Sequence, residues 1–314
     1  MELTTAQLAA LVAIADHGTF DAAARHLHVT PSAISQRIRA LESVAGQVLV
    51  RRSAPCVPTA AGHLLLRVAR QTQLLLAEVG DVLAHDAGDA VDLPVAVNAD
   101  SLATWLRPAL GELAGWEDVA FRLFVEDQGF SADLLRRGEV LAAVTSEPLA
   151  VQGCVAERLG TMRYVPAAAP ALVARWRHGN GVDWARMPMV VFNDKDELQH
   201  RVLQARGVLR PRVVHRVPTA TDFHEAVRLG LGWATVPEQQ LLPDLADGRL
   251  VTLGRRLHVD VELFWHRWRL DSTLLTRLSD VVRRAAGDGL RRAEHPGAAR
   301  GAAPPKTAPP TCAH

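Results

Sequence analysis

Apolar side chains recur every three or four residues through the N-terminal part of the chain, which is the spacing that buries one face of a helix. A first helix is predicted from Leu8, Leu11, Val12, Ile14 and Ala15. Two short helices joined by a tight bend follow, and a threonine suited to capping precedes each, Thr19 before a helix that ends near Leu27 and Thr30 before the next. Pro31 stands at the first position of the later helix, where a missing N–H costs nothing because it has no intrahelical partner there.

The helix that follows Thr30 has one apolar and one polar face. Ile34, Ile38 and Leu41 fall on the face expected to be buried. The opposite face carries Ser32, Ser35, Gln36 and Arg39. Side chains of these types reach base edges or phosphates, and a helix fits into the major groove of DNA. The pattern therefore predicts either a DNA-reading helix-turn-helix or an ordinary helical hairpin within a core.

A single long helix is predicted from Thr59 to about His85. Its apolar residues recur at roughly helical spacing without an intervening proline: Leu64, Leu65, Val68, Leu74, Leu75, Val79 and Val82. A long apolar stripe without a compact domain of its own needs a partner to cover it, which is either a second subunit or another part of the same chain. A short polar segment, residues 86–90, then marks a hinge.

Residues 92–286 alternate strands with helices, which indicates an α/β fold. The predicted strands are Leu93–Val97, Val119–Val125, Val140–Thr145, Met189–Phe192, Val213–Val217, Trp233–Val236 and Leu257–Trp268. Helices are predicted near residues 101–113, 131–137, 171–178, 196–206 and 221–230. Trp265 and His266 lie on the last of these strands, where we favour a buried core pair over a ligand contact.

Composition sets the scale of the protein and excludes several classes. With 314 residues, 48% of them hydrophobic, the chain is long enough for two domains with sizeable cores. The net charge is only +1, so any contact with DNA must be made by a local group of arginines. The cysteines, Cys56, Cys154 and Cys312, are too few and too far apart for a disulfide framework or a zinc site.

The sequence lacks several patterns that are typical of exported proteins, membrane proteins and enzymes. We expect a soluble, cytoplasmic protein, because the N-terminus lacks the order of a signal peptide and no apolar run reaches about 18 residues. Phosphate-loop and dinucleotide glycine patterns, a serine nucleophile elbow and histidine-rich metal spacing are also missing. The chain is predicted to be no enzyme and to need no cofactor or metal, although catalytic groups that converge only in space leave an enzyme as an alternative.

The N-terminal residues resemble the winged helix-turn-helix of LysR-type transcriptional regulators. The matching positions occur in order: Ala22, Ala23, Leu27, Ser35, Ile38, Leu41, Glu42, Gly46, Leu49, Arg52 and Thr59-Ala60-Ala61-Gly62. Two positions depart from the family pattern. Val50 replaces a phenylalanine of the wing, and Pro31-Ser32 replaces a glutamine-proline pair at the start of the recognition helix. We interpret both as variation within the family.

The resemblance implies an α plus α/β architecture in which two subunits pair. Pairing through the long helix would place two DNA-binding heads on one pseudo-palindromic duplex. The C-terminal domain would resemble periplasmic binding proteins, with a ligand in the cleft between two lobes. The implied parts are a winged helix-turn-helix (1–58), a linker helix and hinge (59–90), an effector-binding domain (91–287; lobe one 91–163 plus 268–287, lobe two 164–267) and a disordered tail (288–314).

Residues of the head are assigned roles in DNA binding on the same basis. Ser32, Ser35 and Gln36 would read base edges, while Arg37, Arg51 and Arg52 would hold phosphates or enter the minor groove. The complete predicted DNA-binding set is Thr30, Pro31, Ser32, Ser35, Gln36, Arg37, Arg39, Arg51 and Arg52.

Polar residues at the ends of predicted strands are the candidate ligand contacts. Asn98–Ser101 and Thr219–Asp222 each follow a strand and open a helix, where free N–H groups and hydroxyls can hold a carboxylate. The alternative is that Ser101 and Thr221 only cap these helices. Asp100 with Glu147 or Asp194 would suit a cationic ligand, although a solvated surface is the alternative for the acidic loop around Asp194. The predicted effector-binding set is Asn98, Asp100, Ser101, Thr145, Ser146, Glu147, Asn193, Asp194, Thr219, Thr221 and Asp222.

Four segments resemble the branch of the family that contains the LysG and ArgP regulators: residues 93–105, 136–140, 159–164 and 263–267. Regulators of that branch sense lysine or arginine and activate a gene for an amino-acid exporter. The resemblance implies an activator with L-lysine or L-arginine as effector, which binds double-stranded DNA, forms a homodimer or a dimer of dimers, contacts RNA polymerase and has no membrane partner. The alternatives are a regulator that answers to another small metabolite and a solute-binding transport component, against which the helix-turn-helix argues.

Overall fold

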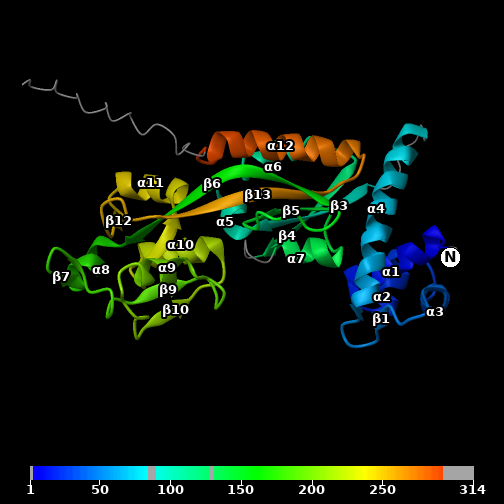
Figure 1. Ribbon diagram of the computed structural model, residues 1–314, viewed down its shortest axis with the longest axis horizontal. Helices are drawn as coiled ribbons and strands as arrows, with labels where there is room; N and C mark the ends of the chain where they lie inside the picture. Colours follow the sequence, from blue (N-terminus) through cyan, green and yellow to red (C-terminus); the bar gives the residue numbers. More distant parts are fainter. Residues whose placement is uncertain (1–2, 84–89, 127–130, 293–314) are drawn as a thin grey trace, which may run out of the picture.

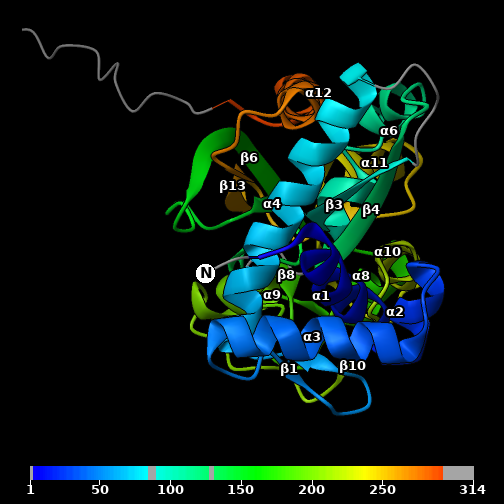
Figure 2. The same ribbon diagram turned by 90° about the vertical axis from the view of Figure 1, so that its right-hand side faces the viewer.

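The computed structural model describes residues 3–83, 90–126 and 131–292. It contains a small helical head, one long helix and an elongated C-terminal α/β domain (Figure 1). The head lies at one end of the molecule, and the long helix α4 runs from it along the edge of the C-terminal domain (Figures 1 and 2).

The head has the predicted helices and a two-stranded wing. Its elements, with the long helix, are α1 (Thr5–His17), α2 (Phe20–His26), α3 (Pro31–Ala45), β1 (Val50–Arg51), β2 (Val57–Pro58) and α4 (Ala60–Leu83). Both predicted caps are confirmed, because the Thr19 hydroxyl accepts the N–H of Ala22 at 3.1 Å and the Thr30 hydroxyl accepts that of Ala33 at 3.2 Å. The predicted apolar face of α3 is confirmed as well, since Ile34, Ile38 and Leu41 are fully buried.

Polar side chains fix the wing against the helices on either side of it. The Glu42 carboxylate on α3 accepts the backbone N–H of Leu49 at 2.9 Å. Thr59 donates its hydroxyl proton to the carbonyl of Val48 at 2.8 Å, and the same oxygen accepts the N–H of Gly62 at the start of α4. These bonds give a physical reason for the glutamate, threonine and glycine of the N-terminal motif.

We expect Gly62→Ala to lower the melting temperature of the head. A Cβ atom at Gly62 would overlap the backbone carbonyl of Leu49, and overpacking of this kind costs about 1–3 kcal/mol. Gly80→Ala is the matched control, because Gly80 lies in the same helix with nothing within 4 Å of such a Cβ, and alanine there should add about 1 kcal/mol of stability. Thermal denaturation followed by circular dichroism compares the two, and equal melting temperatures would contradict the close approach.

The C-terminal domain contains every predicted strand, together with several elements that the sequence did not predict. The single helix predicted near 101–113 is wrong, because turns at residues 104–108 divide it into two short helices, and the helix predicted near 171–178 ends at Arg175. Its elements are β3 (Val91–Asn98), α5 (Ala99–Ala103), α6 (Ala109–Leu113), β4 (Val119–Glu126), α7 (Ser131–Arg137), β5 (Ala142–Thr145), β6 (Cys154–Ala168), α8 (Pro170–Arg175), β7 (Arg177–His178), β8 (Gly181–Val182), β9 (Met189–Val191), α9 (Leu198–Gln204), β10 (Val214–Arg216), α10 (Ala220–Arg228), β11 (Ala234–Pro237), α11 (Glu238–Ala246), β12 (Val251–Thr252), β13 (Val259–Trp268) and α12 (Thr273–Gly289).

One mixed sheet runs through both lobes of this domain. The strand order is β11-β6-β13-β5-β3-β4, and β12 also pairs with β6. Strand β3 is parallel to both β4 and β5, whereas β6 and β13 pair antiparallel along their length. These two long strands run along the axis of the domain and connect the lobes (Figure 1). Strands β9 and β10 form a separate parallel pair in lobe two.

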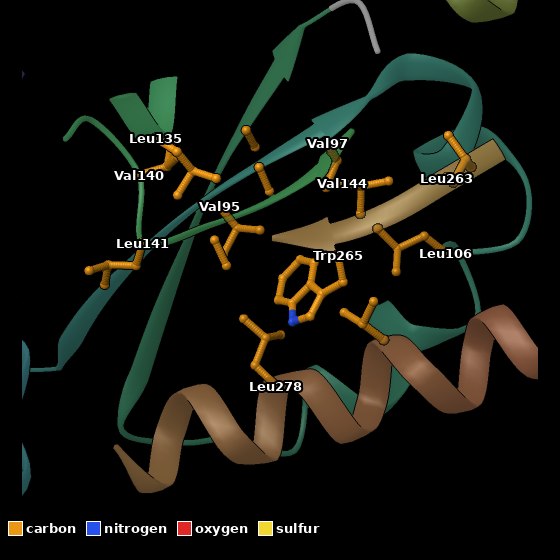
Figure 3. Packing of buried hydrophobic residues seen from close by; sticks show 14 of the residues in the cluster. Val95, Val97, Leu106, Leu135, Val140, Leu141, Val144, Leu263, Trp265 and Leu278 are labelled. Carbon is orange, nitrogen blue, oxygen red and sulfur yellow. The ribbon is translucent and has the colours of Figure 1, made fainter. Parts of the chain in front are cut away.

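Each lobe has its own hydrophobic core. In lobe one, Val95 and Trp265 belong to one cluster with Leu278 of α12 (Figure 3). Trp265 therefore packs in the core of lobe one, although the predicted boundary assigned it to lobe two (164–267). In lobe two, Met187, Met189 and Trp233 belong to one cluster, and a second cluster lies beside it around Val236 and Leu241. Separate cores allow the lobes to move as two bodies about the strands that join them.

Trp265 and His266 form the predicted core pair. Trp265 is 1% exposed, and its indole N–H donates to the hydroxyl of Ser279 at 2.9 Å. His266 is fully buried, and this burial lowers the pKa of its imidazole, so the ring is neutral at neutral pH. The prediction that both residues are buried in the core is confirmed.

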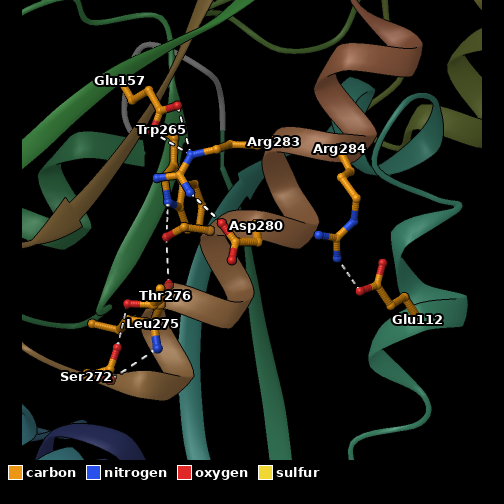
Figure 4. A network of polar contacts seen from close by, with 10 residues as sticks. Glu112, Glu157, Trp265, Ser272, Leu275, Thr276, Asp280, Arg283 and Arg284 are labelled. Atoms are coloured by element: carbon orange, nitrogen blue, oxygen red, sulfur yellow. Dashed lines mark hydrogen bonds and ion pairs between the residues drawn. The ribbon is translucent and has the colours of Figure 1, made fainter.

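Helix α12 covers lobe one and is oriented by polar contacts at both ends. Ser272 caps it by accepting the N–H of Leu275 at 3.1 Å, and Arg283 donates to Glu157 at 2.9 Å and to Asp280 at 2.7 Å (Figure 4). Arg284 pairs with Glu112 on the other side of the helix. Because these ion pairs are exposed, they contribute little free energy, and the buried leucines hold the helix in place.

Two features of the C-terminal domain differ from the sequence-based picture. Strand β6 is missing from the predicted strands because charged residues such as Glu157 and Arg158 interrupt its alternation where it passes between the lobes. Helix α12 ends at Gly289, beyond the predicted boundary at 287, and Leu290 is buried against the lobe-one core. The predicted hinge at 86–90, apart from Ala90, and residues 293–314 of the predicted tail lie outside the described residues.

No helix in the described ranges combines the length and the apolar character needed to cross a membrane.

Candidate DNA-binding head and ligand cleft

The predicted DNA-binding residues share the outer face of the head. Thr30, Pro31, Ser32, Gln36 and Arg39 are exposed along α3, while Ser35 and Arg37 are half-buried. The hydroxyls of Thr30 and Ser32 lie 2.9 Å apart at the start of the helix. In Figure 2, α3 runs across the front of the molecule with β1 just below it.

The wing adds basic side chains beside this helix. Arg51 lies on β1, Arg52 follows it, and both are exposed. The Arg52 guanidinium lies 5.2 Å from the centre of the Phe20 ring, which orients it by a cation–π contact. Within the described ranges, none of the ion pairs involves Arg39, Arg51 or Arg52, so their charges are available to phosphates.

A cleft of about 670 Å³ lies between the two lobes, a size that suits a small metabolite. Strand ends from both lobes and the loop before α9 form its walls. Its lining residues are Asn98, Ala99, Asp100, Val125, Glu126, Ser146, Phe192, Asn193, Lys195, Asp196, Glu197, Leu198, Arg201, Pro218, Phe223 and Thr235. Four residues of the predicted effector-binding set are among them: Asn98, Asp100, Ser146 and Asn193.

Three of the predicted hydroxyl contacts instead serve the local structure. Ser101 is fully buried, and its hydroxyl accepts the indole N–H of Trp105 at 2.8 Å. Thr145 is also fully buried, and its hydroxyl accepts the N–H of Glu147 at 3.2 Å. Thr219 caps α10 by accepting the N–H of Asp222 at 3.3 Å, whereas the alternative interpretation assigns the capping roles to Ser101 and Thr221. The cleft lining includes none of them.

The remaining predicted contacts are not part of the cleft lining. Glu147 pairs with Arg136 at 2.6 Å, and Asp194 pairs with Arg216 at 2.7 Å. The side chain of Asp194 is 76% exposed, which matches a solvated surface acid. Thr221 and Asp222 are exposed on the first turn of α10.

Asp196 organises the loop that forms one wall of the cleft. Its carboxylate accepts the backbone N–H of Phe192 at 2.9 Å, that of Leu198 at 3.1 Å and the side-chain amide of Gln199 at 3.1 Å. Burial raises the pKa of this carboxyl, against the effect of those hydrogen bonds. A solvated surface is therefore the wrong interpretation for Asp196, because local hydrogen bonds turn it inward.

Two buried polar atoms of the cleft have no partner within the protein. Asn98 is 3% exposed and Thr235 is 2% exposed, and both line the cleft. In the part of the chain that the structure describes, neither the Asn98 carbonyl oxygen nor the Thr235 hydroxyl makes a hydrogen bond. Burying such groups is unfavourable unless something binds them, so the pair points to a ligand with N–H donors.

The charge of the cleft favours a cation. Its carboxylates are Asp100, Glu126, Asp196 and Glu197, which outnumber the basic Lys195 and Arg201. Glu126 and Thr235 were not among the predicted contacts. In the sequence, Glu126 follows an apolar strand and Thr235 lies within one, so neither stands out as a ligand contact. Only the three-dimensional structure shows that both line the same cleft, one from each lobe.

The structure holds no sign of metal or thiol chemistry in the described residues. No group of three or more histidine, cysteine or acidic side chains there is arranged to hold a metal ion. Cys56 and Cys154 are free thiols, and burial raises the pKa of Cys154 to about 12, so this thiol is protonated at neutral pH.

A winged helix-turn-helix joined by a long helix to a two-lobed domain with a polar cleft is the arrangement expected of a DNA-binding regulator with a ligand-binding domain. Residues 5–63 match the family model described as "Bacterial regulatory helix-turn-helix protein, lysR family", and residues 88–287 match the model described as "LysR substrate binding domain". The chain belongs to the LysR family of bacterial transcriptional regulators.

Similar proteins carry the same architecture. The lysine export transcriptional regulatory protein LysG of Corynebacterium efficiens is 49% identical over 283 residues, which cover 90% of this chain and 97% of that protein. ArgP from Mycobacterium tuberculosis has a crystal structure with a TM-score of 0.81 and 43% identity, covering 93% of this chain and all of that one. Full-length LysG from Corynebacterium glutamicum with bound effector Arg has a TM-score of 0.75 and 42% identity, covering 92% of this chain and all of that one.

These matches confirm the predicted family, branch and fold class. The relatives are named as transcriptional regulators rather than as enzymes, in agreement with the sequence-based prediction.

Proposed function

We propose that this protein regulates transcription of a gene for basic amino-acid export, and that lysine or arginine bound between the lobes is its signal. The proposal rests mainly on the acidic cleft, which contains two buried oxygens without hydrogen-bond partners, one on Asn98 and one on Thr235. The name of the Corynebacterium efficiens relative and the bound Arg of the Corynebacterium glutamicum structure support this proposal. Such a regulator acts in the cytoplasm, where the chromosome is.

The cleft offers a complementary partner for each part of a basic amino acid. Asn98 and Thr235 accept hydrogen bonds from an ammonium or guanidinium group, and the Asp100 and Glu126 carboxylates balance its charge. Arg201 is exposed at the rim and suits the ligand carboxylate. Phe192 and Phe223, whose ring centres lie 6.2 Å apart, provide an apolar surface for the methylene chain.

A ligand held this way touches both lobes at once. Asn98 and Glu126 belong to lobe one, whereas Thr235 and the loop before α9 belong to lobe two. The ligand favours the arrangement of lobes that binds it better, and the shift equals its difference in affinity for the two arrangements.

The DNA-binding part of the proposal assigns α3 and the wing to one half of a pseudo-palindromic operator. The exposed residues Ser32 and Gln36, with half-buried Ser35, read bases, and Arg37, Arg51 and Arg52 hold phosphates. Pairing of two subunits through α4 supplies the second head. The exposed apolar side chains of α4 support this pairing: Leu64, Val68, Leu75, Leu76 and Val79. Activation of transcription further requires a contact with RNA polymerase.

Isothermal titration calorimetry with the purified protein tests the ligand. We expect arginine and lysine to bind, and citrulline and norleucine, which lack the side-chain cation, to bind at least tenfold more weakly. A thermal-shift screen over other amino acids follows the same binding, because a ligand selective for the folded state raises the melting temperature. Binding of an uncharged or acidic metabolite in place of arginine and lysine would establish the alternative of a different effector.

Thr235→Val is expected to weaken arginine binding without weakening the fold. Valine keeps the shape of threonine but removes a buried hydroxyl that has no partner, so the ligand-free melting temperature should stay the same or rise. Loss of one hydrogen bond to a cation should reduce arginine affinity by about 10-fold or more. Thr276→Val is the control, because the Thr276 hydroxyl donates to Ser272 far from the cleft. Unchanged arginine affinity in Thr235→Val would remove this residue from the ligand site.

A further inference from the structure

The DNA-binding head is fastened to lobe one of its own chain by a compact group of charges, Asp16, Arg70, Asp92 and Arg122, which we call the head cluster. Asp16 lies at the end of α1, Arg70 on α4, Asp92 on β3 and Arg122 on β4. The cluster therefore joins the head, the long helix and the sheet of lobe one, which are separate parts of the sequence.

Asp16 is the shared partner of two guanidinium groups. Arg70 is only 5% exposed and donates to both carboxylate oxygens of Asp16, while Arg122 donates to Oδ2 at 3.0 Å. Arg122 also donates to Asp92 at 2.7 Å, within lobe one. Burial acts to raise the pKa of Asp16, but Arg70 and Arg122 outweigh it and hold the pKa below its usual value, so the carboxylate is ionised at neutral pH.

Contacts with the backbone of lobe one extend the same attachment along α4. The Arg70 side chain donates to the carbonyl of Gly138 at 2.9 Å, and the His63 ring nitrogen lies 3.0 Å from the carbonyl of Arg137. Gly138 has a φ of 71°, and a Cβ atom there would overlap the backbone of Arg67, so the two segments approach as closely as glycine allows. Near the other end of α4, Glu78 accepts the N–H of Leu274 at 2.8 Å.

The strands that carry the cluster also reach the ligand cleft. Strand β3 runs from Asp92, in the cluster, to Asn98, whose side chain lines the cleft. The parallel strand β4 runs from Arg122 to Glu126, which lines the cleft beside it, and Asn98 is paired with Glu126 in the strand register. One end of a rigid strand pair thus holds the head, and the other end faces the ligand.

We propose that the head cluster is the connection through which lobe one holds the DNA-binding head and passes the state of the cleft to it. A change at the carboxyl ends of β3 and β4 moves Arg122 relative to Asp16, and the head with its long helix responds as one body. The attachment itself stands on the contacts above, whereas its role in signalling rests on the proposed function.

Arg122→Leu tests the connection directly. It removes the ion pair between Asp16 of the head and β4 of lobe one, while the contacts of α4 with Arg137, Gly138 and Leu274 remain. Asp16 keeps its pairing with Arg70, so the head stays folded. Asp92→Asn is the matched control, because it weakens the pairing of Arg122 within lobe one and leaves the Arg122–Asp16 pair in place. Hydrogen–deuterium exchange should become at least fivefold faster in peptides covering residues 63–74 and 134–141 of Arg122→Leu, and should stay as in the wild type in Asp92→Asn.

The second readout is the ratio of operator affinities with and without arginine, measured on DNA sites that the wild-type protein selects from a random pool. We expect a wild-type ratio within the usual range of about 5- to 150-fold, a ratio near one in Arg122→Leu, and an unchanged arginine affinity by calorimetry in both. Unchanged exchange in Arg122→Leu would show that the Arg122–Asp16 ion pair does not hold the head, which would overturn the proposal, and faster exchange with a wild-type ratio would overturn the transmission. A wild-type ratio of one would instead refute the proposed arginine response, while the exchange comparison still decides whether the attachment exists.

Discussion

Val68→Glu is expected to abolish self-association of the protein and with it high-affinity binding to a two-half-site operator. Val68 is 48% exposed on α4, in line with Leu64, Leu75 and Val79, which are also exposed. Burying such side chains against a second subunit contributes about 1.5–3 kcal/mol each, and a carboxylate placed among them would be buried without a partner. Analytical ultracentrifugation should show a folded monomer, with self-association weakened by 100-fold or more.

The loss of DNA binding follows from the loss of the second head. Two linked heads on one duplex gain about 10²- to 10⁴-fold in affinity over a single head, so operator binding should fall by that factor while binding to an isolated half-site stays the same. Gln73→Glu is the control, since it adds the same charge at an exposed position of α4 outside the apolar stripe. A dimeric Val68→Glu protein would show that α4 is covered by something other than its counterpart.

Gln36→Ala should lower the affinity for selected operator sequences by about 5- to 150-fold. This factor corresponds to the loss of about 1–3 kcal/mol, which is the contribution of one good contact to a base edge. Gln36 is exposed on the outer face of α3, one turn from Ser32, and the buried face of the helix is unaffected by its removal. Binding to unrelated DNA should stay unchanged, because that binding depends on phosphate contacts.

Fluorescence anisotropy with operator and unrelated duplexes, at one fixed salt concentration, separates the two effects. Ser43→Ala is the control, as Ser43 is exposed on the last turns of α3. Equal operator affinities for the wild type and Gln36→Ala would remove Gln36 from the residues that read bases.

Local chemistry made the head predictable from sequence. Threonine caps, Pro31 at the first helical position and the spacing of Ile34, Ile38 and Leu41 depend only on neighbours along the chain, and each is as predicted. The same holds for α4 and for the alternation of strands and helices, where the period of the apolar pattern decides the element.

The cleft was predictable only in part, because its walls come from distant segments. Asn98 and Asp100 were found since they follow a strand, the usual position of ligand contacts in α/β sheets. Ser101 occupies the same junction, but one further step along α5 turns its hydroxyl into the core against Trp105. Thr235 gave no signal, since a threonine within a buried strand has the same local pattern whether or not its hydroxyl meets a ligand.

The attachment of the head to lobe one was outside the reach of sequence patterns altogether. Asp16 and Arg122 are separated by most of the head and the long helix, and each has the surroundings of an ordinary surface residue in the sequence. Only the packing of α4 against β3 and α7 brings them within 3.0 Å.

The most direct test of the account measures arginine binding and DNA binding in the same preparation. Operator affinity is followed by anisotropy while arginine is titrated, and calorimetry gives the arginine dissociation constant of the free protein. If the protein is a ligand-responsive regulator, operator affinity should change as arginine is added, and citrulline should not change it. The arginine concentration at half of this change should lie near the dissociation constant, displaced only because DNA-bound protein binds arginine with a different affinity. Operator binding that is the same at every arginine concentration, in a protein that binds arginine, would contradict the claim that the cleft controls the head.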